Sequence, residues 1–357
     1  MSHKRLLIPG PTESPIEILQ QQAKWLIGHR GPEYTALYTG VIEKLAKYFE
    51  TERHVATLTA SGTIWMDITA RNMVQKRALA GVCGAFSDRM YKTIQDAGKP
   101  VDLLKVEPGK AIKKDMVMEA LAKAEYDTVA IVHNETATGV RNPIEDIGKA
   151  IKKEYPDIMF VVDTVSSAGG DYLVPEKLNA DIMFTSSQKC FAMPPGLSMA
   201  FYSDAAVERA RSVPGRGHYT DLIAIHDYYQ KKKQNHTTPN VSLIYALDFQ
   251  LDRMLKEGHQ ARYERHLAMA ELTRKWAAKK MKMFPEPGYE SVTVSTMANT
   301  LGKDIGALNK ELGKRGYQIA NGYGDLKEKT FRIGHMGEWT PSEIKSLLWH
   351  IDDIWGE

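Results

Sequence analysis

Short apolar runs alternate with helical patterns along most of the chain, which limits the folds open to it. Each run has the length and composition of a strand buried on both faces. The expected strands cover residues 54–59, 79–83, 102–106, 128–133, 158–162, 181–185 and 197–202. Strands that alternate with helices form a mainly parallel sheet between helical layers. The sequence therefore predicts an α/β fold around a seven-stranded sheet.

The two ends of the chain have different patterns. The stretch LLIPGPTESP is rich in proline and glycine, so residues 1–15 should form an extended arm. Helices are expected at 16–27, at 34–50 and from Thr63 to Lys76, and two more between 240 and 281. After Pro285, strands (291–297, 330–333) and helices (304–315, 341–355) alternate, as in a small α+β domain. We expect a large domain at 16–255 and a small one at 256–357 that begins in a long connecting helix.

Composition excludes several classes of protein. With 43% hydrophobic and 25% charged residues, the chain is an ordinary globular protein. Its net charge of +3 is too small, and its basic residues too dispersed, for a nucleic-acid partner. Two cysteines, Cys83 and Cys190, fit a reducing compartment and cannot form a CxxC zinc site, so no metal is expected. No apolar run approaches the roughly 18 residues of a membrane span, and MSHKRLLIPG lacks a signal peptide's apolar segment. We expect a cytoplasmic protein without a membrane partner.

Two charged residues follow two neighbouring expected strands. Asp163 comes directly after 158–162, and Lys189 follows 181–185 after a short polar loop. The carboxyl ends of parallel strands form the ligand-binding edge of such a sheet, so both charges should face one crevice. A lysine can form a Schiff base with an aldehyde, and an aspartate can hold a protonated ring nitrogen, which is what pyridoxal phosphate (PLP) requires. A structural ion pair is the alternative.

Other strand ends carry further candidates. Ser61-Gly62-Thr63 lies where a strand turns into a helix and could bind a phosphate, or simply cap the helix. Phe86 follows the run at 79–83, where an aromatic ring could cover a planar cofactor or pack in the core. The loop HNETATG at 133–139 follows another strand. The common nucleotide-binding patterns GxGxxG and GxxxxGK[ST] do not occur in the sequence.

Taken in order, these motifs resemble those of class V aminotransferases of PLP fold type I, close to the alanine–glyoxylate and serine–pyruvate group. The resemblance runs through PGPT, SGT, HNETATGV, VDTVSSAGG, TSSQKCFAMPPG, NHTTPNVSL and FRIGHMG. It implies PLP as the cofactor and a homodimer with active sites at the subunit interface. It also implies that the amino group of a small amino acid (alanine, serine or similar) passes to glyoxylate, pyruvate or 2-oxoglutarate by a ping-pong mechanism through aldimine and ketimine.

The resemblance also assigns residues to roles. Lys189 would be the Schiff-base lysine and the proton carrier, and Asp163 would pair with the pyridinium nitrogen. Phe86 matches the stacking aromatic, and Thr136 matches the hydroxyl at the ring's phenolic oxygen. The phosphate cradle would comprise Ser61, Gly62, Thr63, Gln188 and, from the partner subunit, Thr237. Some relatives have a tyrosine where this chain has Gln234.

The resemblance assigns fewer residues to substrate binding. Arg332 matches the arginine that binds the substrate α-carboxylate, and Gly10 would bring backbone close to the substrate. His29 and Arg30 lie in an HRG loop that resembles the substrate-phosphate pair of phosphoserine aminotransferases, and Arg216 and His218 lie in another polar loop.

Three alternatives therefore stay open. The first is a phosphoserine aminotransferase, because an arginine and a histidine suit a phosphate dianion. The second is a lyase of the cysteine desulfurase type, although that class needs a mobile cysteine late in the chain, and neither Cys83 nor Cys190 is so placed. The third is an α/β binding protein that does not use PLP.

Overall fold

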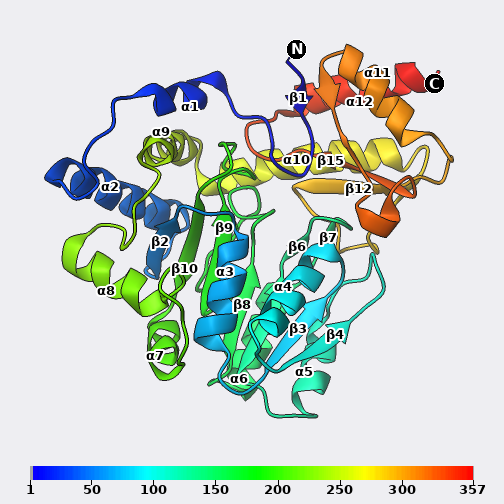
Figure 1. The fold of residues 1–357 in the computed structure, drawn as a ribbon. Coiled ribbons are helices and arrows are strands. Elements are labelled where there is room, and N and C mark those ends of the chain that lie inside the picture. Colours follow the sequence, from blue (N-terminus) through cyan, green and yellow to red (C-terminus); the bar gives the residue numbers. More distant parts are fainter. Residues whose placement is uncertain (1–2, 357) are drawn as a thin grey trace.

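A seven-stranded sheet with helices on both faces forms the centre of the protein (Figure 1). The computed structural model describes residues 3–356. The strand order is β2-β10-β9-β8-β5-β3-β4, and β10 runs antiparallel to both of its neighbours. The strands are β2 (His54–Leu58), β3 (Ala78–Val82), β4 (Val101–Lys105), β5 (Thr128–Val132), β8 (Met159–Asp163), β9 (Ile182–Ser186) and β10 (Ser198–Tyr202). The predicted α/β fold with a mainly parallel sheet of seven strands is confirmed.

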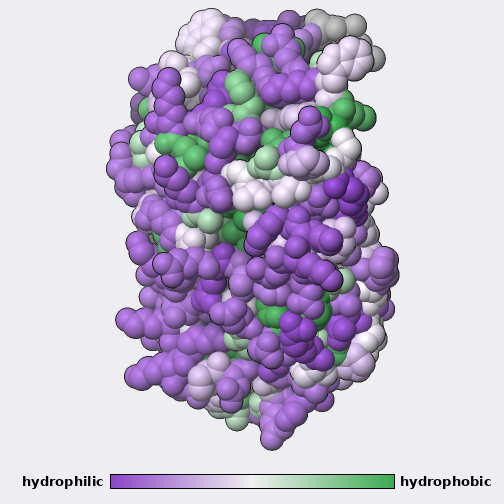
Figure 2. Space-filling model, turned by 90° about the vertical axis from the view of Figure 1, so that its left-hand side faces the viewer, coloured by the Kyte–Doolittle hydropathy of each residue, from purple (hydrophilic) through white to green (hydrophobic). Residues whose placement is uncertain are grey.

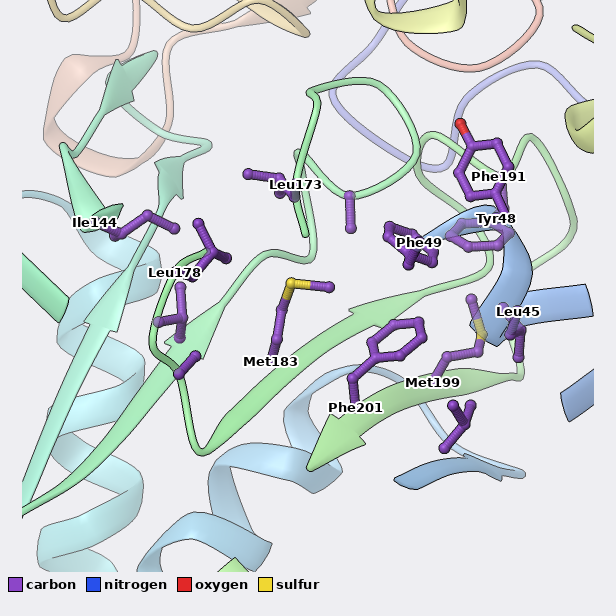
Figure 3. Close-up of a cluster of buried hydrophobic side chains, with 14 of the residues drawn as sticks. Leu45, Tyr48, Phe49, Ile144, Leu173, Leu178, Met183, Phe191, Met199 and Phe201 are labelled. Atoms are coloured by element: carbon purple, nitrogen blue, oxygen red, sulfur yellow. The ribbon is translucent and has the colours of Figure 1, made fainter. Parts of the chain in front are cut away.

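Each face of this sheet has its own hydrophobic core, because successive side chains of a strand point to opposite faces. In β8, Phe160 and Val162 pack in one cluster, whereas Val161 packs in the other. The first cluster includes residues of α2 (Pro32–Tyr48), α5 (Lys114–Leu121), α6 (Ile144–Glu154) and α9 (Val241–Glu257). Figure 3 shows part of it, with Phe49 and Phe201 close together at 4.6 Å between ring centroids.

The second cluster lies under the helices of the other face. These are α3 (Thr63–Ile68), α4 (Ala85–Asp96), α7 (Asp204–Ser212) and α8 (Leu222–Lys232). A π-helical turn (Thr69–Met73) continues α3, and the short strands β6 (Asn134–Glu135) and β7 (Val140–Arg141) form a two-stranded ribbon beyond β5. Helices therefore cover both faces of the sheet.

A smaller four-stranded sheet follows the long helix α10 (His259–Ala277). Its order is β11-β12-β15-β14, formed by β11 (Lys282–Met283), β12 (Val294–Ala298), β15 (Thr330–Gly334) and β14 (Ala320–Asn321). A third hydrophobic cluster joins it to α10, α11 (Ile305–Lys314) and α12 (Pro341–Trp355). The 3₁₀ turn Gly324–Leu326 lies in the loop before β15. The expected α+β region is thus present, while the domain boundaries at residues 15 and 255 stay predictions.

The N-terminal arm lies against this smaller sheet. Its strand β1 (Arg5–Leu6) pairs in parallel with β13 (Tyr317–Gln318), and Leu7 belongs to the third hydrophobic cluster. Beyond β1, the N–H of Thr12 donates to the carbonyl of Gln188 at 3.0 Å. The arm therefore connects the smaller sheet to the loop that carries Lys189.

Two expected helices were too long. The helix expected at 16–27 is only α1 (Ile16–Gln20) followed by a 3₁₀ turn (Gln21–Ala23). Trp25 and Leu26 beyond it are 94% and 70% exposed, so no packing stabilises further helical turns there. The helix expected to end at Lys76 ends with the π-helical turn at Met73. Within residues 3–356, no helix is long and apolar enough to span a membrane.

Candidate active site

Asp163 and Lys189 lie together at the carboxyl ends of β8 and β9. Asp163 is the last residue of β8, opposite Phe184 of β9, and Lys189 follows β9 by three residues. Both side chains are buried, at 3% and 7% exposure, and both line a cavity of about 280 Å³. The strand topology predicted from the sequence brings them together as expected.

Burial changes the acid–base properties of both groups. It raises the pKa of Asp163 to about 7, although the N–H of Val165, which donates to the carboxylate at 2.8 Å, opposes this change. It lowers the pKa of Lys189 to about 8. The Lys189 ammonium donates to the carbonyl of Pro9 in the arm. Each side chain is thus bonded to backbone, so the site offers a ligand both an amine and a carboxyl group.

The turn between β2 and α3 forms one wall of the same cavity. Ser61, Gly62 and Thr63 line it together with Gln188. A Cβ on Gly62 would lie 2.5 Å from Cγ2 of Val165, so any larger residue would force the turn away from β8. Hydroxyl and backbone N–H groups of this turn are hydrogen-bond donors that suit a phosphate.

Two further predicted residues line this cavity. Phe86 lies in the first turn of α4, and its ring centroid is 5.9 Å from the Lys189 Nζ. Thr136 follows β6, and its hydroxyl lies 2.5 Å from the hydroxyl of Ser166. The cavity thus combines an aromatic ring, a hydroxyl, a carboxyl and an amine.

Arg332 lies in an adjoining cavity of about 620 Å³, which shares Gly10, Phe86, Thr136 and Lys189 with the first. It is a residue of β15 and is 7% exposed. Its guanidinium donates to the carbonyls of Thr136 at 3.2 Å and of Asn321 at 2.9 Å, which fixes its direction. Burial lowers the pKa of Arg332 to about 10, so it remains a cation at neutral pH.

Gly10 packs directly against the side chain of Lys189. Its φ is +107°, and a Cβ there would lie 2.6 Å from the Lys189 Nζ. Only glycine combines this backbone conformation with such a close approach. Gly10 therefore brings the arm into contact with the Lys189 amine, while its predicted closeness to a substrate stays a prediction.

The remaining predicted residues are not among those that line either cavity within one chain. Arg30 donates to the carbonyls of Asn235 at 2.5 Å and His236 at 3.2 Å, which are residues of the loop that carries Thr237. Gln234 donates to the hydroxyl of Thr35 at 2.8 Å. Helix α2 and the residues just before it therefore hold the Thr237 loop in place. His29 precedes Arg30 in this region.

The polar loop with Arg216 and His218 also lies outside the two cavities. Arg216 donates to Asp221 at 2.8 Å, within its own loop. The ring of His218 is 6.2 Å from that of His236, next to the Thr237 loop. These residues therefore belong to the surroundings of the Thr237 loop and not to the lysine cavity of the same chain.

Sequence reasoning missed three residues. Arg89 lines the smaller cavity, and its guanidinium carbon is 4.8 Å from the Phe86 ring centroid. Tyr323 lines the larger cavity, 5.4 Å from Phe86 between ring centroids. Glu135 is buried behind Phe86 and accepts hydrogen bonds from its helix. Glu135 lies within the HNETATG loop and Tyr323 lies between two glycines, but neither local pattern indicates which residues these side chains contact.

The comparisons with known proteins identify the family. The family described as aminotransferase class V matches residues 10–299, so the chain belongs to the class V aminotransferases. It is 40% identical over 353 residues to an uncharacterized aminotransferase of Methanocaldococcus jannaschii, covering 97% of this chain and 91% of that protein. It is 31% identical over 350 residues to the serine–glyoxylate aminotransferase of Methylorubrum extorquens, covering 93% of this chain and 86% of that protein.

A solved structure supports the same assignment. The alanine–glyoxylate aminotransferase of Nostoc sp. superposes with a TM-score of 0.93 at 25% identity, covering 99% of this chain and 96% of that one. The protein is thus an enzyme of the transaminase class, and membership of this family implies PLP. The chemistry of the smaller cavity fits that cofactor, because it pairs one buried amine with one buried carboxyl group beside an aromatic ring.

Proposed function

We propose that the protein is a PLP-dependent transaminase that moves the amino group of a small amino acid, such as alanine or serine, to a small 2-oxo acid. Glyoxylate, pyruvate and 2-oxoglutarate are the candidate acceptors. The observation that carries this proposal is the presence of Lys189 and Asp163 in one buried cavity with the turn 61–63. The names of relatives that use serine and glyoxylate, or alanine and glyoxylate, support the substrate class.

The residues of the cavity suit distinct tasks. The amine of Lys189 loses its proton near pH 8, so it can bind the cofactor aldehyde and later carry a proton from the substrate Cα. Asp163 would hold the protonated ring nitrogen, and Phe86 would cover one face of the ring. When bound, PLP supplies an electron sink for the pair released from the Cα–H bond. Thr136 would bond to the ring's phenolic oxygen, while Ser61, Gly62, Thr63 and Gln188 would bind the phosphate.

Arg332 would orient the amino acid. A guanidinium binds a carboxylate through two parallel hydrogen bonds, which fixes the direction of the Cα–H bond. Because the carbonyls of Thr136 and Asn321 hold this guanidinium, it needs little reorganisation when substrate arrives. Gly10 would leave room for the substrate beside the lysine.

A panel of amino donors and acceptors tests the proposal. We expect purified protein with PLP to show the absorption of lysine-bound cofactor, and Lys189→Ala to lose it. Addition of alanine or serine should convert the bound cofactor to its amino form, and a 2-oxo acid should restore it. A protein that stays colourless with PLP would contradict the proposal, and release of sulfide or ammonia would indicate a lyase.

We further propose that the active enzyme is a homodimer. Thr237 is not among the cavity-lining residues of its own chain, and Ile16, Trp25 and Leu26 are 61%, 94% and 70% exposed. Figure 2 shows the side that carries α2 and α8, where small hydrophobic groups interrupt a mainly hydrophilic surface. In this arrangement Thr237, and with it His29 and Arg30, would complete the partner's site.

Mixing two inactive variants tests the shared site. Lys189→Ala and Thr237→Ala subunits are combined at limiting PLP. The hybrid dimer contains one site with both native residues, so the mixture should regain activity that neither variant shows alone. A mixture that gains nothing, or a monomer in sedimentation, would contradict the dimer. A cytoplasmic location stays a prediction.

One observation favours phosphoserine as a second candidate substrate. The larger cavity is lined by Lys4, Lys310, Arg332 and Lys189, and neither aspartate nor glutamate is among its lining residues in the described chain. Such a cavity attracts an anionic substrate. We expect Lys310→Ala to weaken phosphoserine turnover more than alanine turnover, with Lys314→Ala on the same helix as the control, because Lys314 pairs with Glu311. Equal losses of phosphoserine and alanine turnover would exclude phosphoserine as the substrate. The same two turnover rates measured for Arg30→Ala test whether Arg30 binds the substrate phosphate.

The lyase alternative gains no support. Both Cys83 and Cys190 are buried, and burial raises the pKa of each thiol to about 12. A thiol with so high a pKa is a poor nucleophile at neutral pH.

A further inference from the structure

Glu135 is a buried carboxylate next to the residues proposed to hold the cofactor ring. It is the last residue of β6, it is 0% exposed, and it directly precedes Thr136. We propose that Glu135 is a positioning residue, which fixes the Phe86 ring relative to the Thr136 loop and so sets the gap into which the cofactor ring fits. This inference rests on the proposed PLP chemistry.

Four donors surround the Glu135 carboxylate. One oxygen accepts from the N–H of Phe86 at 3.2 Å and of Ala137 at 3.0 Å. The other accepts from the N–H of Ser87 at 2.8 Å and from its hydroxyl at 2.7 Å. Two of these donors are backbone groups in the first turn of α4, and one belongs to the loop of Thr136. A single side chain therefore joins the helix that carries the stacking ring to the loop that carries the hydroxyl.

The packing around Gly84 shows how close this contact is. A Cβ on Gly84 would lie 2.5 Å from the carboxyl carbon of Glu135, so the start of α4 rests directly on the side chain. Ser87 also accepts at its hydroxyl from the N–H groups of Cys83 and Gly84, each at 3.0 Å. The entry to α4 thus has little freedom as long as Glu135 is present.

A glutamine cannot replace this arrangement. Its amide has one acceptor oxygen, and its NH₂ group would face N–H donors of α4 or of Ala137. Glu135→Gln should therefore loosen the start of α4, where the Phe86 ring is attached, without removing any group that would touch the cofactor. Aromatic rings attract one another only in preferred relative orientations, so losing the orientation of the Phe86 ring should lower the affinity for PLP.

The test is a double-mutant cycle on PLP affinity. We expect Glu135→Gln to weaken PLP binding about 10-fold and to reduce the circular dichroism of bound PLP. In the Phe86→Ala background the same substitution should have little further effect, since the ring through which it acts is absent. Glu145→Gln is the control, because Glu145 lies in the first turn of another helix, α6, and should leave both readings unchanged.

The outcomes separate the possibilities. An equal loss of affinity in both backgrounds would mean that Glu135 acts through general stability, and an unchanged affinity would also overturn the inference. If Glu135→Gln does not fold, Glu135→Asp is measured by the same criteria, because it keeps the charge but withdraws both oxygens by one carbon–carbon bond. Wild-type protein that binds no PLP would refute the proposed function instead, before the cycle begins.

Discussion

Lys189 should reduce the stability of the protein when no cofactor is bound. The ammonium group is buried at 7% exposure, and burial lowers its pKa from 10.5 to about 8. A tenfold change in a protonation constant corresponds to about 1.4 kcal/mol, so this depression costs the folded apoprotein about 3 kcal/mol at neutral pH. Lys189→Met, which has a similar shape and no charge, should remove that cost.

The destabilisation by Lys189 should depend on pH, because the lysine loses its proton at a lower pH in the folded chain than in the unfolded one. Below about pH 8 the lysine is protonated in both the folded and the unfolded chain, so the whole cost is present. Between about pH 8 and pH 10.5 the unfolded chain binds more protons than the folded one, and stability rises with pH. The advantage of Lys189→Met should therefore be about 3 kcal/mol at pH 7 and should disappear as the pH approaches 10.5.

Urea unfolding of the two apoproteins measures this difference. PLP is removed with hydroxylamine, and free energies of unfolding are compared at several pH values. Lys275→Met serves as the control, since Lys275 is 76% exposed and its substitution should change stability by less than about 0.5 kcal/mol. If Lys189→Met is no more stable than the wild type, or if its advantage does not change with pH, the burial argument is wrong.

Three further predictions concern single side chains. Arg332→Gln should lower kcat/KM for the amino acid by about 100-fold, as expected for the loss of charge-assisted hydrogen bonds, while PLP absorption stays unchanged; loss of the absorption would assign Arg332 to the cofactor. Arg89 lines the smaller cavity together with the turn 61–63, where the phosphate would bind, so Arg89→Gln should weaken PLP binding about 10-fold but leave pyridoxal, which lacks the phosphate, unaffected; equal losses for both ligands would exclude a phosphate contact. Gly10→Ala should reduce kcat more than 10-fold and also lower stability, because its Cβ would lie 2.6 Å from the Lys189 Nζ and φ at this position is +107°; a near-native kcat in stopped-flow kinetics would show that the arm moves to accommodate the methyl group.

The sheet was predictable because strands buried on both faces have continuous apolar runs. Their boundaries differ from the expected ones by at most one residue, as for β8, expected at 158–162 and found at Met159–Asp163. The helix expected at 16–27 is shorter than predicted because Trp25 and Leu26, near its expected end, do not pack in this chain. Periodicity alone cannot show whether a neighbouring surface exists.

The site was predictable where motifs follow strands directly. Asp163 and Lys189 came together because adjacent parallel strands end at one edge. Glu135 was missed because its contacts with Phe86 and Ser87 span 49 and 48 residues, and no local pattern encodes them. Tyr323 reaches the cavity from the loop before β15, and Arg89 from one helical turn beyond Phe86, so both depend on tertiary placement.

The N-terminal arm has a practical consequence for engineering the protein. Pro9 and Gly10 contact Lys189, and β1 pairs with β13. Removing Pro9 and Gly10 would therefore remove part of the wall of the cavities around Lys189. A fusion partner or purification tag is better attached after α12, at the other end of the sequence. Gly356 ends that helix, and a Cβ placed on it would have no other atom within 4 Å.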